Sequence, residues 1–329
     1  MRRRLVTARL ITLLKVLGDS ASLAFRRETG LSGSDWYLIA QIGEYGPLAL
    51  TEIAVRLRQD KGQASRAVKR LVSAGLLSRE HLRAAIALTA AGKATLARIR
   101  RLAKARNAAL IRDLDAGELE FLPRSLTKLQ GNARLLLANA QALERDDSEP
   151  ARTVRADDAQ QRKSGNGLSA PDGLLAAELI TLQSLLHRSA TSTFKRETGL
   201  SDFDWRVMSQ IGEHAPLTLI QLVPMMSRDK SQVGRAVVSL EALGLITRTR
   251  IGNGRHILIA TTERGRAVYD QLAQLALQRN AALLSGLNAQ EQQALTAILG
   301  KLTSSAAAML EREQARPSAR RSARRLPLP

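Results

Sequence analysis

The chain contains two copies of one sequence, offset by 169 residues. The segment F-R-R-E-T-G-L-S at residues 25–32 returns as F-K-R-E-T-G-L-S at residues 194–201. Residues 10–79 align with residues 179–248 without a gap, and 33 of the 70 positions are identical. This identity is too high for chance, so the two copies, called repeat one and repeat two below, are predicted to share one fold.

The repeats also predict how the chain is divided. We expect repeat one over residues 1–145 and repeat two over residues 174–312, each long enough for a hydrophobic core. Residues 146–173 carry Asp, Glu, Ser, Gly and Pro with almost no large apolar side chains, which predicts a flexible linker. Residues 313–329 place arginines among Ser, Ala and Pro and are predicted to be a disordered basic tail.

The amino-terminal residues could be mistaken for an export signal, because three arginines precede an apolar stretch. Arg9 and Lys15 interrupt that stretch, and its L-I-T-L sequence recurs at residues 179–182. A cleaved signal has no reason to recur inside the chain, so we predict an amphipathic helix here. No apolar run approaches the roughly 20 residues that a membrane span needs, and we expect a cytoplasmic protein that does not enter the membrane.

The composition favours a polyanionic partner. Fifty Lys and Arg against thirty Asp and Glu give a net charge of +20, with +14 in residues 1–145 and +3 in residues 174–311. A positive field of this size attracts nucleic acid. The chain has no cysteine, which excludes disulfides, thiolate zinc sites and thiol sensing. Its four histidines lack metal-ligand spacing and no catalytic motif appears, so we predict no metal, no cofactor and no enzymatic activity.

Hydrophobic spacing in repeat one predicts four helices before a glycine stop. They are expected over residues 5–25, 35–44, 51–58 and 60–74, with Asp35 and Thr51 as N-caps and Gly75 ending the last. Two short helices joined by a tight turn are typical of a helix-turn-helix. In the second of the two, Ala67, Val68 and Leu71 are spaced to face inward.

The outward positions of that second helix are amide and cationic side chains. In repeat one they are Lys61, Gln63, Arg66, Lys69 and Arg70. The pattern D-K-x-Q-x-x-R-A-V recurs in repeat two, where it supplies Lys230, Gln232 and Arg235. Such groups suit the base edges of the major groove and the phosphates of DNA, whereas the alternative is an ordinary solvated helix face. Because the repeats hold these positions in common, we predict that they contact DNA.

A β-hairpin is predicted after this helix in repeat two. Residues 245–250 and 256–259 flank G-N-G at residues 252–254, and Asn-Gly between β-rich runs is a strong hairpin signal. Arg250 and Arg255 are the expected DNA contacts of this wing. The corresponding interval in repeat one is four residues shorter. A second difference is Pro224 at the position of Val55, which is expected to kink or shorten the first helix of the second helix-turn-helix.

In combination, the D-K-x-Q-x-x-R-A-V helix, the G-L-[LI]-[ST]-R segment after it, the N-G-R wing and the T-x-x-G restart resemble the MarR-type transcriptional regulators. The resemblance implies a mainly α fold with small β-wings, built from two winged helix-turn-helix repeats. Members of this family are dimers on pseudo-palindromic operators, joined through their first and last two helices. The resemblance therefore implies an intramolecular pseudo-dimer that binds double-stranded DNA, and the unequal repeats predict an asymmetric operator.

The resemblance also implies a small aromatic anion as effector. Trp36 and Trp205, with Arg26 and Lys195 a helix away, are candidates to line its pocket, and the alternative is that both tryptophans are core residues at a helix start. Two other functions stay open. The net charge and the basic tail favour an architectural binder of the nucleoid, and the short first wing with Pro224 favours a protein scaffold whose DNA binding has decayed.

Overall fold

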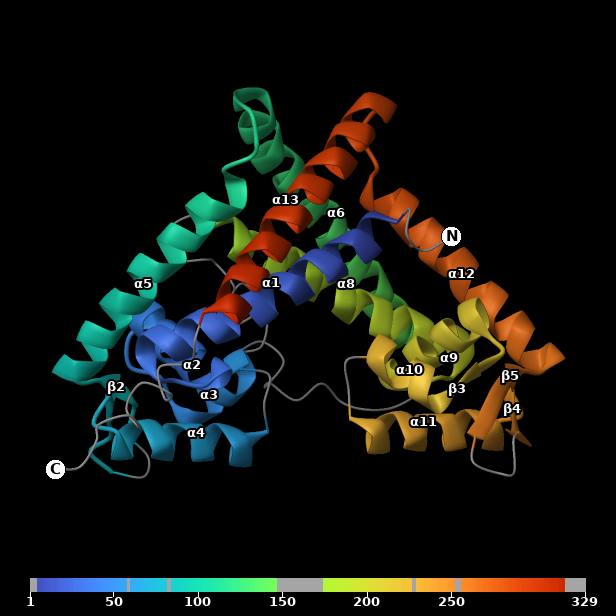
Figure 1. Ribbon diagram of the computed structural model, residues 1–329, viewed down its shortest axis with the longest axis horizontal. Helices are drawn as coiled ribbons and strands as arrows, with labels where there is room; N and C mark the ends of the chain where they lie inside the picture. Colours follow the sequence, from blue (N-terminus) through green and yellow to red (C-terminus); the bar gives the residue numbers. More distant parts are fainter. Residues whose placement is uncertain are drawn as a thin grey trace, which may run out of the picture. The chain divides into compact units, whose positions relative to one another are not determined.

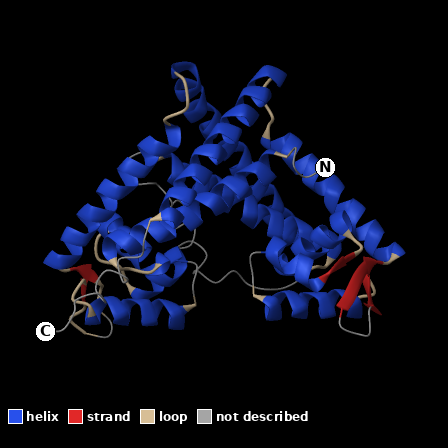
Figure 2. Cartoon of the chain, viewed as in Figure 1, coloured by secondary structure: helices blue, strands red, loops and turns tan. Residues whose placement is uncertain are grey.

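The computed structural model describes residues 5–57, 60–81, 84–146, 174–226, 229–251 and 256–316. These residues are mainly helical, with two small antiparallel sheets (Figure 2). In repeat one the elements are α1 (Val6–Thr29), α2 (Gly33–Tyr45), α3 (Leu50–Leu57), α4 (Lys61–Ser73), β1 (Leu77–Ser78), β2 (Ala87–Leu88), α5 (Ala90–Ile111) and α6 (Ala116–Asp146). In repeat two they are α8 (Leu175–Thr198), α9 (Asp202–His214), β3 (Leu217–Thr218), α10 (Leu219–Met226), α11 (Lys230–Ala242), β4 (Ile246–Ile251), β5 (His256–Thr261), α12 (Glu263–Leu283) and α13 (Ala289–Ala315).

The expected helices and both wings are present, so the predicted mainly α winged-helix repeat is confirmed. The predicted linker falls, from residue 147 onward, outside the described residues. The last helix continues to Ala315, so residues 313–315 are helical rather than part of the predicted tail. The rest of that tail, from residue 317, also lies outside the description.

The chain forms two compact units, and each draws elements from both repeats. The repeat-one unit holds, among the described residues, 5–126, 174–181 and 289–316. The repeat-two unit holds residues 127–146 and 182–288. The winged helix of repeat one is therefore completed by the last helix of repeat two, and the winged helix of repeat two by the end of α6.

In the repeat-one unit, α1 and α13 lie side by side (Figure 1). The apolar stripe of α1 is buried, including Leu10 and Leu13. At one end of the pair Arg27 forms an ion pair with Glu313, and a second guanidinium nitrogen of Arg27 donates to the backbone carbonyl of Glu313 at 2.7 Å. Lys301 on α13 forms a further ion pair with Glu118. Apolar and ionic contacts together thus fix α13 to elements of repeat one.

In the repeat-two unit, the end of α6 plays the corresponding part. The amide of Asn132 donates to the carbonyls of Leu283 and Ser285, at 2.9 Å each. The hydroxyl of Ser192, on α8, donates to the carbonyl of Ala140 at 3.4 Å. Helix α6 of repeat one thereby satisfies backbone and side-chain groups of repeat two.

A half-buried arginine lies at the same repeat position in each unit, but the two have different surroundings. Arg106 donates to the hydroxyl of Ser20, and Arg279 donates to that of Ser189. Burial lowers the pKa of both guanidinium groups, and that of Arg279 falls to about 10. The charge of Glu313 partly offsets this for Arg106, whereas hydroxyl and carbonyl oxygens are the partners of Arg279. The two units therefore share the position of this arginine but differ in the groups that surround it.

Each winged helix closes over its own apolar core. In repeat one the buried side chains include Leu38, Ile39, Ile53, Leu71 and Ile86. The T-x-x-G restart has a local explanation. Thr89 caps α5 by accepting from the backbone N–H of Gly92, and a Cβ on Gly92 would stand 2.0 Å from the carbonyl oxygen of Leu76. Glycine is therefore required where the helix crosses the strand, and Gly265 meets the same restriction in repeat two.

Two predicted N-caps were wrong. Helix α2 begins at Gly33 after Ser32, and Asp35 lies inside the first turn. Helix α3 begins at Leu50, where the carboxylate of Glu52 accepts from the backbone N–H of Ala49 and removes the need for a Thr51 cap.

Of the two effects expected of Pro224, a kink or a shorter helix, the shortening does not occur. Helix α10 runs over eight residues, as does α3 in repeat one. In so short a helix the missing N–H of Pro224 removes a single intrahelical hydrogen bond, and the fully buried Leu222 holds α10 against the core.

Candidate nucleic-acid interface

The D-K-x-Q part of the repeated motif begins a helix in both repeats. The carboxylate of Asp60 accepts from the backbone N–H of Gln63 at 2.8 Å, and Asp229 caps α11 through Gln232 at the same distance. The aspartate shared by the two repeats is thus an N-cap, and the motif fixes where α4 and α11 start. Residues 61–63 and 230–232 in the first turns are exposed, so a phosphate can approach these helix N-termini.

The apolar part of the motif sets which face of each helix is exposed. Ala67, Val68 and Leu71 are at most 3% exposed, and Ala236, Val237 and Leu240 occupy the same core positions in repeat two. The remaining polar side chains therefore face outward. All eight predicted contacts on the two helices are exposed: Lys61, Gln63, Arg66, Lys69, Arg70, Lys230, Gln232 and Arg235.

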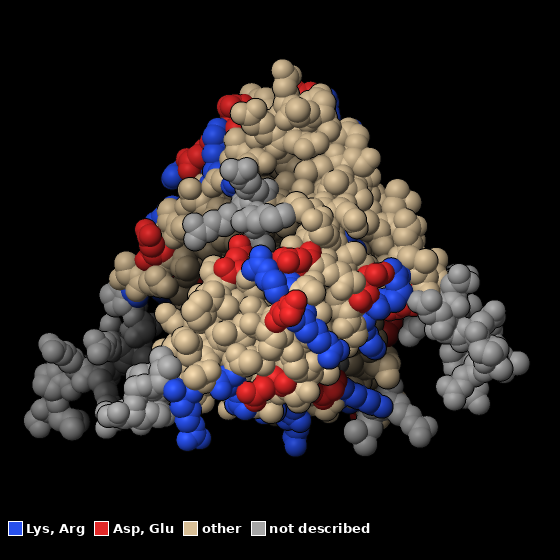
Figure 3. Space-filling model, turned by 90° about the vertical axis from the view of Figure 1, so that its right-hand side faces the viewer, with Lys and Arg blue, Asp and Glu red and all other residues tan. Residues whose placement is uncertain are grey.

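Basic side chains also gather visibly along one edge. In Figure 3, Lys and Arg side chains project below the repeat-two unit, at the level where α11 lies in Figure 1. Above that edge acidic and basic side chains are mixed. In this view, the edge at the level of α11 thus carries a row of basic side chains.

One of the eight side chains is already engaged within the protein. The guanidinium of Arg70 donates to both carboxylate oxygens of Asp35, at 2.7 Å from Nη2 and 3.4 Å from Nε. Asp35 is 7% exposed and also accepts from the hydroxyl of Ser32. The pair joins α4 to α2, so the first role of Arg70 is to hold the helix in place. Repeat two has Ser239 at this position.

The wings differ as the sequence predicts. In repeat two, β4 pairs with β5 over six residues, and Arg250 is exposed on β4. In repeat one, β1 and β2 have two residues each. Arg255 and the G-N-G turn lie outside the described residues, and so does Arg83. The wing of repeat two is thus the longer one.

That wing is also tied to its helix. Glu241 on α11 forms an ion pair with Arg248 on β4, and the hydrogen bond from Arg248 lowers the pKa of the Glu241 carboxyl. Repeat one has Val72 in place of Glu241, so its helix and wing lack this bond.

The two tryptophans predicted to line an effector pocket are half-buried and pack against the apolar cores. The ring of Trp36 stacks on Phe25 with centroids 4.2 Å apart, and Trp205 packs on Phe194 at 4.5 Å. Both therefore serve as core residues at a helix start, which was the alternative interpretation. Arg26 and Lys195 are exposed one helix away.

The described part of the chain shows neither a metal site nor a membrane-spanning helix. Within it, no cluster of three or more His, Asp or Glu residues is arranged to hold a metal ion. None of its helices combines the length and the apolar character that crossing a membrane requires.

Comparison with models of protein families relates both repeats to one family. Residues 29–84 match one model of the MarR family, and residues 200–257 match another. The chain carries two MarR-type domains in tandem. Each match contains the helix-turn-helix described above, and the second extends into the wing.

Solved structures of MarR-type and other transcriptional regulators resemble part of the chain. A probable transcriptional regulator from Pseudomonas aeruginosa is 28% identical over 34% of this chain and 87% of its own, with a TM-score of 0.30. A MarR-family regulator from Rhodococcus sp. RHA1 is 25% identical over 36% and 87%, with a TM-score of 0.32. A putative MarR-family regulator from Listeria monocytogenes, solved with a 26mer DNA, is 24% identical over 41% and 93%, with a TM-score of 0.34. A search of curated proteins finds no match.

Sequence reasoning about the MarR-type repeats missed the acidic partners of the site. Asp35 was interpreted as a cap, although its equivalence with Asp204 and the unmatched Arg70 and Ser239 were visible in the repeat alignment. The partner of Arg70 was hidden because 35 residues separate the two in sequence.

Proposed function

We propose that this chain is a sequence-specific double-stranded DNA-binding transcriptional regulator whose recognition helices are α4 and α11. The observation that carries the proposal is the shared construction of the two helices. In each, an aspartate caps the start, small and branched apolar residues face the core, and Lys, Gln and Arg at matching positions face solvent. This arrangement offers charged groups for phosphates and bidentate donors for base edges.

We further propose that one chain acts as a pseudo-dimer. The support is that each compact unit includes helices from both repeats, with α13 packed on α1 in the repeat-one unit. The two repeats are also covalently linked, which gives an effective concentration of about millimolar for the second half. One chain per operator is therefore expected, with binding that does not depend on chain–chain association.

The operator is proposed to be asymmetric, with half-sites about one helical turn apart. The support is that the two halves offer different side chains. Repeat one has Lys69 and a clamped Arg70 on its helix, where repeat two has Val238 and Ser239. Repeat two has the longer wing with Arg250. Because the two repeats present different side chains to DNA, we expect them to bind half-sites of different sequence.

Selection from randomised duplex DNA tests these proposals together. The full chain is expected to select one defined site with unequal halves, and the double variant K61A/R66A is expected to lose preference in one half while K230A/R235A loses it in the other. The matched control is Lys15→Ala, because Lys15 is an exposed, ion-paired lysine on α1. A clean palindrome would refute the asymmetry, and a mass of two chains per site would refute the single-chain mode.

The same selection separates the alternative functions. The net charge of +20 supports an architectural binder, which would occupy random and genomic DNA equally. A scaffold protein would bind no DNA even at low salt. Repeating the selection with aromatic acids present tests the proposed anionic effector, which should weaken binding to the selected site at unchanged ionic strength.

A further inference from the structure

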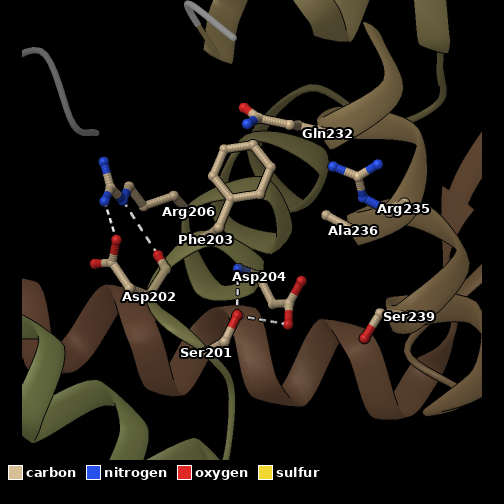
Figure 4. A pocket seen from close by; sticks show the side chains of 9 residues that line it. All are labelled: Ser201, Asp202, Phe203, Asp204, Arg206, Gln232, Arg235, Ala236 and Ser239. Atoms are coloured by element: carbon tan, nitrogen blue, oxygen red, sulfur yellow. Dashed lines mark hydrogen bonds and ion pairs between the residues drawn. The ribbon is translucent and has the colours of Figure 1, made fainter. Parts of the chain in front are cut away.

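The repeat-two unit contains a pocket beside its recognition helix. It has a volume of about 460 Å³, within the range of small-molecule sites. Figure 4 shows Phe203 and Asp204, from the start of α9, on one wall, and Gln232, Arg235 and Ser239, from α11, along another. The pocket therefore lies between the element that supports the recognition helix and the helix itself.

Repeat one shows what fills the equivalent space when a side chain is present. There the guanidinium of Arg70 reaches from α4 to both carboxylate oxygens of Asp35. In repeat two the aspartate is kept as Asp204, and Ser239 stands where the arginine would be. The repeat with the arginine thus serves as an internal comparison for the repeat without it.

The carboxylate of Asp204 is held as in repeat one. The hydroxyl of Ser201 donates to Asp204 at 2.7 Å, and that of Ser32 donates to Asp35 at 2.6 Å. Asp35 is nine-tenths buried under its arginine, whereas Asp204 is only half-buried. Among the residues that the structure describes, no Lys or Arg forms an ion pair with Asp204. Repeat two thus has the carboxylate of this ion pair, Asp204, but has Ser239 in place of the arginine.

The other charges of the pocket leave Asp204 as the anion to be matched. Asp202 is neutralised by an ion pair with Arg206. Arg235 lies on the same wall as Gln232 in Figure 4, with its guanidinium directed away from the Asp204 carboxylate. Phe203 stands where repeat one has Ser34 and adds an aromatic ring to the pocket, where Figure 4 shows it on the side of Gln232. A pocket lined by both a carboxylate and an aromatic ring favours a flat organic cation.

We propose that this pocket binds a small organic cation with a guanidinium or amidinium group, which occupies the space that Arg70 fills in repeat one. The cation forms a forked hydrogen bond with Asp204 and lies against Phe203. Bound there, it joins the start of α9 to α11 as the Arg70–Asp35 pair joins α2 to α4. Because Gln232 and Arg235 also line the pocket, the ligand acts on repeat two and leaves repeat one unchanged.

Calorimetric titration of the full chain with benzamidine, without DNA and at constant ionic strength, tests the proposal. One equivalent is expected to bind, and benzamide, its neutral analogue of the same shape, is expected not to bind. Asp204→Asn should weaken binding roughly tenfold or more. Ser239→Arg should abolish it, because the new side chain fills the pocket.

The internal comparison supplies the decisive variant. Arg70→Ser recreates the pocket in repeat one, so the stoichiometry should rise from one to two, and D35N/R70S should return it to one. Circular dichroism establishes that each variant is folded. If R70S or D35N/R70S does not fold, the comparison of S239R with the unchanged chain tests the pocket instead. Absence of benzamidine binding at millimolar concentration, or binding that ignores D204N and S239R, would overturn the proposal. Because no DNA is present, either result leaves the DNA-binding proposal to its own test.

Discussion

Arg27 forms an ion pair with Glu313, although 286 residues separate the two in the sequence. The first residue belongs to the first helix of repeat one and the second to the last helix of repeat two. Glu313 also lies near the half-buried guanidinium of Arg106 and raises its pKa against the effect of burial. A single carboxylate from one repeat thus compensates two arginines of the other.

Replacing Glu313 with alanine is expected to lower the free energy of unfolding by about 1–3 kcal/mol, because it removes the ion pair with Arg27 and the counter-charge of the half-buried Arg106. The control is Glu311→Ala on the same helix, an exposed residue that should cost little. Urea denaturation measures both. Equal losses would mean that Glu313 contributes only as a helix residue.

Removing residues 289–329 is expected to expose the apolar stripe of α1, because α13 covers it within the repeat-one unit. Amide hydrogen exchange should then accelerate in α1, which lies at the opposite end of the sequence. A shorter truncation after residue 316 keeps α13 and serves as the control. Unchanged exchange in α1 after the long truncation would contradict the helix pairing.

Arg70→Ala is expected to destabilise the repeat-one unit by about 1–3 kcal/mol, because it leaves the buried Asp35 carboxylate without its forked donor. Ser239→Ala is the repeat-matched control and should have little effect on stability. Denaturation of D35N/R70A should recover part of the loss, since the uncompensated charge is then gone. If R70A and S239A behave alike, Arg70 acts only at the surface.

The ion pair of Glu241 with Arg248 predicts an acid dependence. The pKa of Glu241 is lowered in the folded state, so its contribution to stability is present above the ordinary carboxyl pKa of 4.5 and is lost as the pH falls through the lowered value. Glu241→Gln should therefore flatten the stability curve between about pH 3 and 5. Unfolding measured across that range, beside the exposed control Glu311→Gln, checks the prediction, and an unchanged slope would contradict it.

Arg66→Ala should weaken binding to the selected DNA site by about 1–3 kcal/mol, because its exposed side chain is placed to reach a base edge. Fluorescence anisotropy with specific and random duplexes measures the loss. A loss confined to the specific duplex indicates base contact. Equal losses on both duplexes would instead assign Arg66 to the phosphate backbone.

The sequence predicted the local features well, because each depended on short spacings. The helix expected over residues 60–74 is present directly after Asp60, Gly75 follows it with a positive φ of 69°, and the longer hairpin appears in repeat two. The predictions that failed depended on partners distant in the chain. Asp35 was assigned to a cap because its true partner, Arg70, comes 35 residues later.

The exchange of helices between repeats could not be derived from periodicity either. The amphipathic patterns of α1 and α13 show that each needs an apolar partner, but they do not say which one. The pairing of Arg27 with Glu313 identifies that partner for the repeat-one unit. The pocket beside Asp204 was hidden for a similar reason, since it arises from a side chain that repeat two lacks.

The packing of α1 against α13 has a consequence for biosynthesis. Helix α1 is translated well before helix α13, which covers its leucines. Domains usually mature in the order of their synthesis. Here Leu10 and Leu13 of α1 stay uncovered until α13 has also emerged from the ribosome, so we expect a chaperone to protect this helix during synthesis.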